Sequence, residues 1–228
     1  KFCGWVYEGI ARTQDELDGH ATQQGANVGD CLYKDISGPN GEPDGVIDAY
    51  DQTVLGSGLP KVNFGLSTHM EYKGFDLNIS TYGVLNYHVS DDIYNSLNSC
   101  YGYGNKEVGM LDANRWSEDG STYLSSVPRT YAANNATLGW NDLFSSRKIQ
   151  NAAYWKIANV ELGYNFPDKW FGGYVSGVRL YVSAQNLYTF TGYHGYNVDY
   201  AGGTFTPGYN FCSFPSARTF MCGLHFTF

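Results

Sequence analysis

Residues 62–85 read VNFGLSTHMEYKGFDLNISTYGVL, and this stretch alternates apolar and polar side chains in two runs on either side of Lys73-Gly74. A β-strand points every second side chain to the same face, so each run is typical of a strand with one apolar and one polar face. The short Lys73-Gly74 segment is typical of a tight turn between two paired strands. The stretch therefore predicts a β-hairpin, with Val62, Phe64, Leu66 and Met70 on the apolar face of its first strand.

The same alternation recurs elsewhere in the chain, and it predicts an all-β fold. Three further runs occupy residues 155–166, 178–190 and 219–228, and a partial strand is expected at residues 2–9. Several runs reach the roughly 9–11 residues that a tilted strand needs to cross a bilayer, whereas strands of soluble proteins are usually about 5–6 residues long. Together these runs predict six strands.

The connections between the predicted strands alternate between short and long. Residues 73–74 and 167–177 form short connections, whereas those near 10–60, 88–150 and 191–216 are long. Bacterial outer-membrane barrels combine short periplasmic turns with long extracellular loops, and this polarity places Phe228 at the periplasmic side. A β-sandwich is the alternative, because its strands alternate in the same way.

The composition supports a β protein and disfavours several other classes. The 228 residues include 20 Tyr, 13 Phe, 5 Trp and 28 Gly, and only 16% are charged. No run approaches the roughly 20 apolar residues of a transmembrane helix. The formal net charge is −8 without a basic cluster, so nucleic acid is not an expected partner. The five cysteines lack the spacing of a zinc site.

Several longer strings carry a family resemblance. They occur in this order: GDCLYKDISG, YKGFDLNI, RWSEDG, NAAYWKIANVELGYNFP, VRLYVSAQNLYTFTGYHGYNVD and SFPSARTFMCGLHFTF. With these strings the chain resembles the C-terminal part of SusC/RagA-type TonB-dependent outer-membrane transporters of Bacteroidetes. The resemblance covers most of the chain from about Gly29 onward.

The resemblance implies a fold and a function for the four regions of the chain. It implies the last strands of a 22-stranded antiparallel transmembrane β-barrel, with the plug domain and the rest of the barrel upstream of this chain. Residues 1–60 are then a strand end and an acidic extracellular loop, 61–89 a hairpin, 90–150 a long extracellular loop, and 151–228 the last three strands with their loop. The transporter is expected to import oligosaccharides or peptides, with a SusD-like surface lipoprotein as partner and energy from TonB.

An acidic stretch in the first long connection is a candidate calcium site. Calcium takes about 6–8 oxygen ligands, and a glycine often forms the turn between them. Side-chain oxygens are available from five residues, which are Asp35, Ser37, Asp44, Asp48 and Asp51. The family pattern is interrupted here by PNGEP at residues 39–43 and ends on Asp rather than Glu. A hydrogen-bonded acidic turn without metal is therefore the alternative.

Aromatic residues in the long connections are candidates for contact with substrate or with the lipoprotein. Flat aromatic faces stack on sugar rings and also contact peptides. The candidates are Tyr101, Trp116, Tyr193, Tyr196 and Tyr209. Alternatively, these rings pack the loops against one another.

Catalysis is not expected from this sequence. The five histidines are scattered, and neither a zinc-protease motif nor a nucleotide-binding motif is present. The second hypothesis for function is a soluble, non-catalytic, aromatic-rich β module that captures glycans. Cys222, Leu224 and Phe226 distinguish the two hypotheses, because a barrel exposes them to lipid whereas a sandwich buries them against a second sheet.

Overall fold

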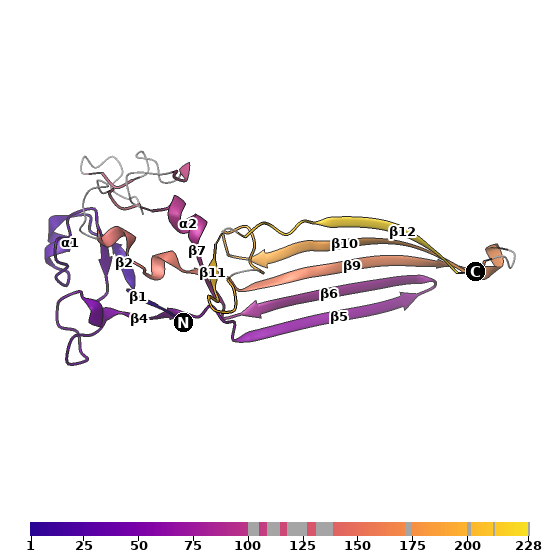
Figure 1. The fold of residues 1–228 in the computed structure, drawn as a ribbon, viewed down its shortest axis with the longest axis horizontal. Helices are drawn as coiled ribbons and strands as arrows, with labels where there is room; N and C mark the ends of the chain where they lie inside the picture. The colour runs from indigo at the N-terminus through magenta and orange to yellow at the C-terminus, as the bar shows by residue number, and fades with distance from the viewer. Residues whose placement is uncertain are drawn as a thin grey trace. The chain divides into compact units, whose positions relative to one another are not determined.

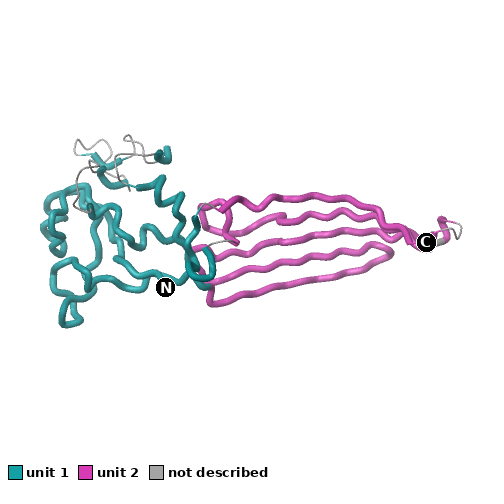
Figure 2. Tube along the Cα trace, viewed as in Figure 1, with its two compact units in different colours: residues 1–59, 88–150, 201–212 teal, residues 60–87, 151–200, 213–228 magenta. Residues whose placement is uncertain are grey.

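The computed structural model divides the chain into two compact units, which are coloured separately in Figure 2. It describes residues 1–99, 105–108, 115–117, 127–130, 139–171, 175–199, 202–211 and 213–227. Unit 1 comprises residues 1–59, 88–150 and 201–212, and unit 2 comprises residues 60–87, 151–200 and 213–228.

Unit 2 is built on a five-stranded antiparallel sheet of long strands. The strand order is β12-β10-β9-β6-β5, and Figure 1 shows the five strands side by side. The strands are β5 (Val62–Tyr72), β6 (Phe75–Leu85), β9 (Tyr154–Phe166), β10 (Gly177–Thr191) and β12 (Thr219–Thr227). A short 3-10 helix, η6 (Asp168–Trp170), follows β9. The predicted hairpin and the other three predicted runs are confirmed.

One irregularity in β9 changes which residues lie on each face of the sheet. Ser80 of β6 pairs with Asn159, but the next residue, Thr81, pairs with Ile157, so Ala158 is an extra residue in β9. Such a β-bulge re-aims the side chains that follow it. Strict alternation would place Lys156 on the apolar face together with Val160, whereas the bulge brings it to the polar face.

Unit 1 contains short strands and helical turns. β1 (Phe2–Gly4) pairs with β4 (Thr53–Gly56), and β2 (Tyr7–Ile10) pairs with β3 (Cys31–Tyr33). The order of a third small sheet is β11 (Tyr209–Asn210), β7 (His88–Asp91) and β8 (Gln150–Asn151). The helical elements are α1 (Gln14–Asp18), α2 (Asp92–Leu97), η1 (Ala49–Asp51), η4 (Trp140–Asp142) and η5 (Ser146–Lys148).

The prediction of one partial strand at residues 2–9 is wrong. It is divided at Trp5-Val6 into β1 and β2, and neither belongs to the five-stranded sheet. The division has a physical reason, because the Trp5 backbone N–H donates to Phe144 O at 3.3 Å and its ring N–H donates to Asp48 O at 2.8 Å. These contacts anchor Trp5 within unit 1.

The core of unit 1 is built from residues of its long connections. Cys31, Tyr33 and Ile47 are almost fully buried, and Trp140 and Leu143 pack against them. The Tyr33 hydroxyl donates a hydrogen bond to the Trp140 carbonyl, 107 residues away in sequence. Among the described residues, no helix has the length and apolar character needed to cross a membrane.

Candidate functional site

The five-stranded sheet exposes large side chains on its apolar face and buries two charged side chains on its polar face. Leu180 is 42% exposed, Val182 is 50% exposed and Leu224 is 57% exposed. On the opposite face, Asp76 is only 4% exposed and Lys156 only 3%. Folded soluble proteins bury apolar side chains and leave charged ones in water. This sheet does the reverse, as expected of a wall between lipid and an aqueous pore.

The three residues chosen to distinguish a barrel from a sandwich lie on the exposed apolar face. Cys222 is exposed, as are Leu224 and Phe226. Within unit 2, the described residues form no second sheet that could cover them. This arrangement favours the barrel over the sandwich.

An ion cluster occupies the polar face near the short turns. The Arg179 guanidinium donates two hydrogen bonds to the Asp76 carboxylate, at 3.0 and 2.5 Å, and a third to Glu161 at 2.6 Å. Asn165 donates to Asp76 at 3.0 Å. Gly163 provides the space for this cluster, since a Cβ there would lie 2.5 Å from Asp76 Oδ1. The charges are therefore paired and hydrogen-bonded, as buried charges need to be.

A second polar contact lies near the other end of the sheet. Lys156 donates to the Asp199 carboxylate in a short ion pair, and the Tyr82 hydroxyl donates to the same carboxylate at 3.3 Å. Asp199 belongs to the segment 192–199 that follows β10, so the ion pair ties this segment to the polar face of the sheet. Sequence reasoning missed Lys156 and Asp199. The sequence held one signal of this contact, because Lys156 is a charged residue at a position where the alternation of its strand predicts an apolar one.

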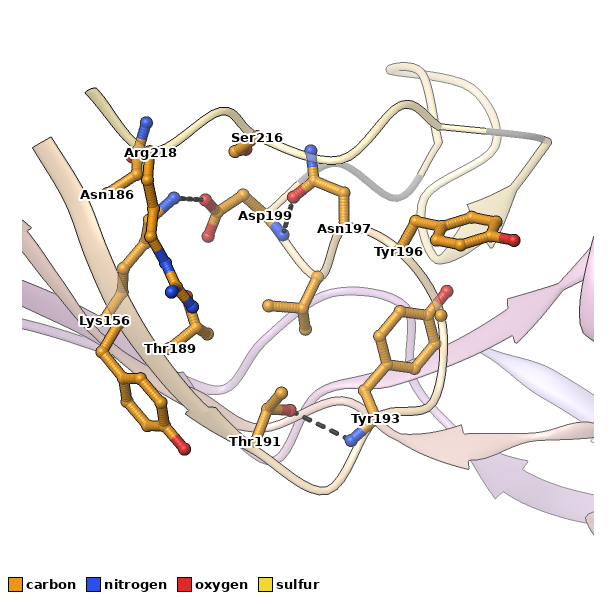
Figure 3. A pocket seen from close by; sticks show the side chains of 13 residues that line it. Lys156, Asn186, Thr189, Thr191, Tyr193, Tyr196, Asn197, Asp199, Ser216 and Arg218 are labelled. Carbon is orange, nitrogen blue, oxygen red and sulfur yellow. Dashed lines mark hydrogen bonds and ion pairs between the residues drawn. The ribbon is translucent and has the colours of Figure 1, made fainter.

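The segment 192–199 and the polar face enclose a cavity of about 210 Å³ (Figure 3). Its lining is mostly polar and includes Lys156, Thr189, Thr191, Asn197, Ser216 and Arg218. Sequence reasoning also missed Arg218, because β10 and β12 are brought together only by their pairing. The cavity offers several polar groups of the kind that orient a bound ligand.

Buried Asp51 organises the acidic stretch of unit 1. Asp51 Oδ1 accepts hydrogen bonds from the backbone N–H groups of Ile36 and Ser37 at 2.7 and 3.1 Å, and Oδ2 accepts one from Asp48 at 2.8 Å. Burial acts to raise the pKa of Asp51, but these backbone hydrogen bonds outweigh it, so the pKa is lowered from its usual value.

The other members of the predicted calcium site also contact nearby backbone. Asp35 accepts from the Gly45 N–H, Asp44 from the Val46 N–H, Asp48 from the Tyr50 N–H, and the Ser37 hydroxyl donates to Gly38 O. Within the described ranges, no three His, Cys, Asp or Glu residues are grouped as metal ligands. These contacts are those of a hydrogen-bonded acidic turn, and the calcium site stays a prediction.

The five predicted aromatic candidates do not form one site. Tyr101 lies outside the described residues. Trp116 is 9% exposed, and Tyr193 is 7% exposed but lines the cavity in unit 2 together with Tyr196. Tyr209 is partly exposed and lies within unit 1. Tyr196 is 68% exposed and borders the cavity in unit 2, where it has a face free to stack on a ligand.

Comparison with curated proteins finds relatives that match across most or all of this chain. The TonB-dependent receptor P3 of Formosa agariphila is 30% identical over 236 residues, which cover 100% of the chain and 22% of that relative. The TonB-dependent receptor SusC of Bacteroides thetaiotaomicron is 26% identical over 209 residues, covering 86% of the chain and 19% of SusC. The chain thus spans about a fifth of the length of these relatives. No protein-family model matches it.

Solved structures show the same fold. The RagAB peptide importer in its open-open state matches 100% of the chain and 22% of the importer chain, with a TM-score of 0.74 and 22% sequence identity. A second structure of the RagAB peptide transporter matches 98% of the chain and 22% of its own chain, with a TM-score of 0.72 and 22% identity. At this identity the likeness establishes the fold of the chain.

Proposed function

The chain belongs to the SusC/RagA-type TonB-dependent receptors, and on that premise we propose that it forms part of the pore wall of an outer-membrane importer. Proteins of this family are outer-membrane transporters and not enzymes. The chain would supply wall strands, and the plug and the remaining strands would come from the rest of the receptor.

The carrying observation is the distribution of apolar and charged side chains over the two faces of the sheet. A large apolar side chain such as Leu180 gains about 1.5–3 kcal/mol when it leaves water. In a bilayer, the exposed apolar side chains of β9, β10 and β12 would contact lipid and contribute this favourable transfer free energy. Paired charges such as Asp76 and Arg179 suit the aqueous side of the wall.

The sheet edges support the same proposal. Within the described part of the chain, β5 and β12 each have one neighbour and form the two edges of the sheet. A free edge presents unpaired N–H and C=O groups, and a closed barrel has no such edge. We propose that further strands of the receptor pair with β5 and β12 and close the barrel.

The lengths of the connections support an orientation in the membrane. The β5–β6 connection is the turn at Lys73-Gly74, and the β9–β10 connection is also short, whereas those after β6 and β10 are long. The short turns would be periplasmic and the long connections extracellular. The end of β12 would then lie at the periplasmic side, as predicted for Phe228, which is outside the described residues.

The proposed solutes are oligosaccharides or peptides, and the proposed partners are a SusD-like surface lipoprotein and TonB. The relatives support this assignment, because one is named SusC and the structural neighbours are titled as a peptide importer. Long extracellular connections would provide the surface for the lipoprotein. TonB would act through the part of the receptor outside this chain.

The test is the location of the native protein and the partners it retains. Outer membranes are fractionated, extracted in mild detergent and analysed by mass spectrometry. We expect the chain in the outer-membrane fraction, within a receptor that co-purifies with a surface lipoprotein. Recovery as a detergent-independent soluble monomer that binds glycans would instead support the soluble module.

A further inference from the structure

The cavity under segment 192–199 carries an uncompensated positive charge. Lys156 and Arg218 are its two cations, and Asp199 is its one anion. The Lys156 ammonium is already paired with Asp199. Arg218 makes no ion pair with any described residue, and its side chain lines the cavity in Figure 3. The charge balance of the cavity therefore leaves one guanidinium available to an anion.

Arg218 is held in place by a specific backbone arrangement. Asn186 lies in an irregularity of β10, between the Gln185 and Tyr188 pairings, and has a left-handed φ of 53°. Its side-chain amide donates to the Ala217 carbonyl at 2.9 Å, directly before Arg218. Asparagine tolerates this conformation better than most residues. Asn186 thus fixes the segment that carries the guanidinium.

Groups around Arg218 suit an oxygen-rich solute. The hydroxyls of Thr189 and Ser216 line the same cavity, and the exposed ring of Tyr196 lies at its border. Hydroxyls can donate to or accept from a ligand, and a flat ring can stack on a sugar or a peptide group. The cavity therefore combines a cation that has no ion-pair partner in the described part of the chain, neutral hydrogen-bonding groups and an aromatic surface.

We propose that this cavity is a subsite for a carboxylate on the solute, with Arg218 as the residue that binds it. A guanidinium can donate two parallel hydrogen bonds to one carboxylate, a geometry that an ammonium does not reproduce. The inference rests on the proposed function, in which the polar face lines the pore. A uronic acid unit of an oligosaccharide and the C-terminus of a peptide both carry the required group.

The experiment is calorimetric binding to the purified full-length receptor with two matched pairs of probes. One pair is a short oligogalacturonate and its methyl ester, and the other is a short peptide and its C-terminal amide. We expect the charged member of one pair to bind about tenfold or more tightly than its neutral partner. The pair that shows this preference identifies the source of the carboxylate.

Variants test whether Arg218 causes the preference for the charged probe. Arg218→Gln should reduce it to within about twofold, and Arg218→Lys should retain part of it because the charge remains. Lys61→Gln removes an exposed positive charge elsewhere in unit 2 and should leave it unchanged. Thermal unfolding of each variant checks that it is folded.

Two results would overturn the subsite. The first is equal or absent binding of the charged and neutral members of both pairs, and the second is a preference that survives Arg218→Gln in a folded receptor. Outer-membrane localisation of the same receptor is measured separately. A receptor that is correctly localised but lacks the preference refutes the subsite alone, whereas a soluble protein refutes the proposed function.

Discussion

The ammonium of Lys156 is paired with the carboxylate of Asp199, 43 residues further along the chain. Lys156 reaches this position because Ala158 is an extra residue in β9, which turns the lysine to the polar face of the sheet. The pair holds the segment 192–199 over that face. The bulge thus keeps the charge of Lys156 away from the apolar face. It also allows the ion pair that holds the segment 192–199 against the cavity.

Replacing Lys156 by Met should release the segment 192–199. The side chain of Lys156 is 4% exposed and that of Asp199 is 20% exposed, so removal of the cation leaves a largely buried carboxylate unpaired. The expected cost is about 3 kcal/mol. Hydrogen exchange of the purified receptor should show faster exchange at residues 193–199. Lys61→Met is the matched control, and unchanged exchange in Lys156→Met would contradict the role of the pair.

A methyl group at Gly163 should destabilise the receptor. In Gly163→Ala the new Cβ would lie 2.5 Å from Asp76 Oδ1 and 2.6 Å from Arg179 Nη2. The Asp76 carboxylate and the Arg179 guanidinium would have to shift out of their present hydrogen bonds, at a cost of about 1–3 kcal/mol, so the midpoint of thermal unfolding should fall. Gly65→Ala is the control, because a Cβ there meets only Thr81 O at 3.6 Å. Equal midpoints for the two variants would refute the tight ion cluster.

An arginine should be tolerated on one face of β10 and not on the other. Val182→Arg places a charge on the apolar face, where the cost in a barrel is about 2–4 kcal/mol near the middle of the bilayer. Gln185→Arg places it on the polar face, at an exposed position. We expect less folded receptor in the outer membrane for the first variant only, as measured by immunoblotting of membrane fractions. Similar losses for both would argue against the assignment of the two faces.

Asp51→Asn should loosen the acidic turn of unit 1. An amide cannot accept from all three backbone N–H groups that the carboxylate now satisfies. The expected cost is about 1–3 kcal/mol, seen as faster hydrogen exchange at Ile36, Ser37 and Asp48. Asp44→Asn is the control, since Asp44 is exposed and, among the described residues, its side chain accepts one backbone hydrogen bond, from the Val46 N–H.

The contribution of Asp51 should depend on pH in a defined direction. Its pKa in the folded chain is lowered, so its ionised form stabilises the turn above the unfolded pKa of about 3.9. This stabilisation is lost as the pH falls below that value through the lowered folded pKa. The exchange difference between Asp51→Asn and the native receptor should therefore shrink in that acidic range. A constant difference down to full protonation would contradict the pKa direction.

Chelation tests the calcium prediction at the same turn. The native contacts of Asp35, Asp48 and Asp51 already satisfy backbone donors without an ion. We therefore expect EDTA to leave hydrogen exchange at residues 35–51 unchanged. Faster exchange after EDTA, reversed by added calcium, would instead establish a metal site.

The long strands were predictable because their signal is local. The alternation across residues 62–85 needs no knowledge of the rest of the chain, and the turn at Lys73-Gly74 follows from the break between its two runs. The position of the β-bulge was not predictable, because it depends on how the strands pair. The extra residue Ala158 is defined only by the pairing of β9 with β6, and strict alternation of the sequence would place Lys156 on the wrong face.

The candidate site was less predictable, because its members meet through long-range contacts. Asp76 and Arg179 of the ion cluster are 103 residues apart in sequence. Arg218 of the cavity directly precedes β12, whereas most of the other lining residues belong to β10 and the segment that follows it. Aromatic content in the loops did point to Tyr196. The same signal also selected Tyr193, which lines the cavity, and Trp116, which is buried in unit 1, because composition does not separate rings at a cavity from rings that pack the interior.

The most direct test of the pore-wall assignment is the accessibility of spin labels on β10. Nitroxides are attached at positions 180, 181, 182 and 185 of the full receptor in lipid vesicles, with the native cysteines replaced. Collisions with oxygen, which concentrates in lipid, are compared with those of a water-soluble nickel complex. We predict that Leu180 and Val182 positions favour oxygen and that Tyr181 and Gln185 positions favour nickel. Oxygen exclusion at 180 and 182 would contradict the assignment of the apolar face to lipid.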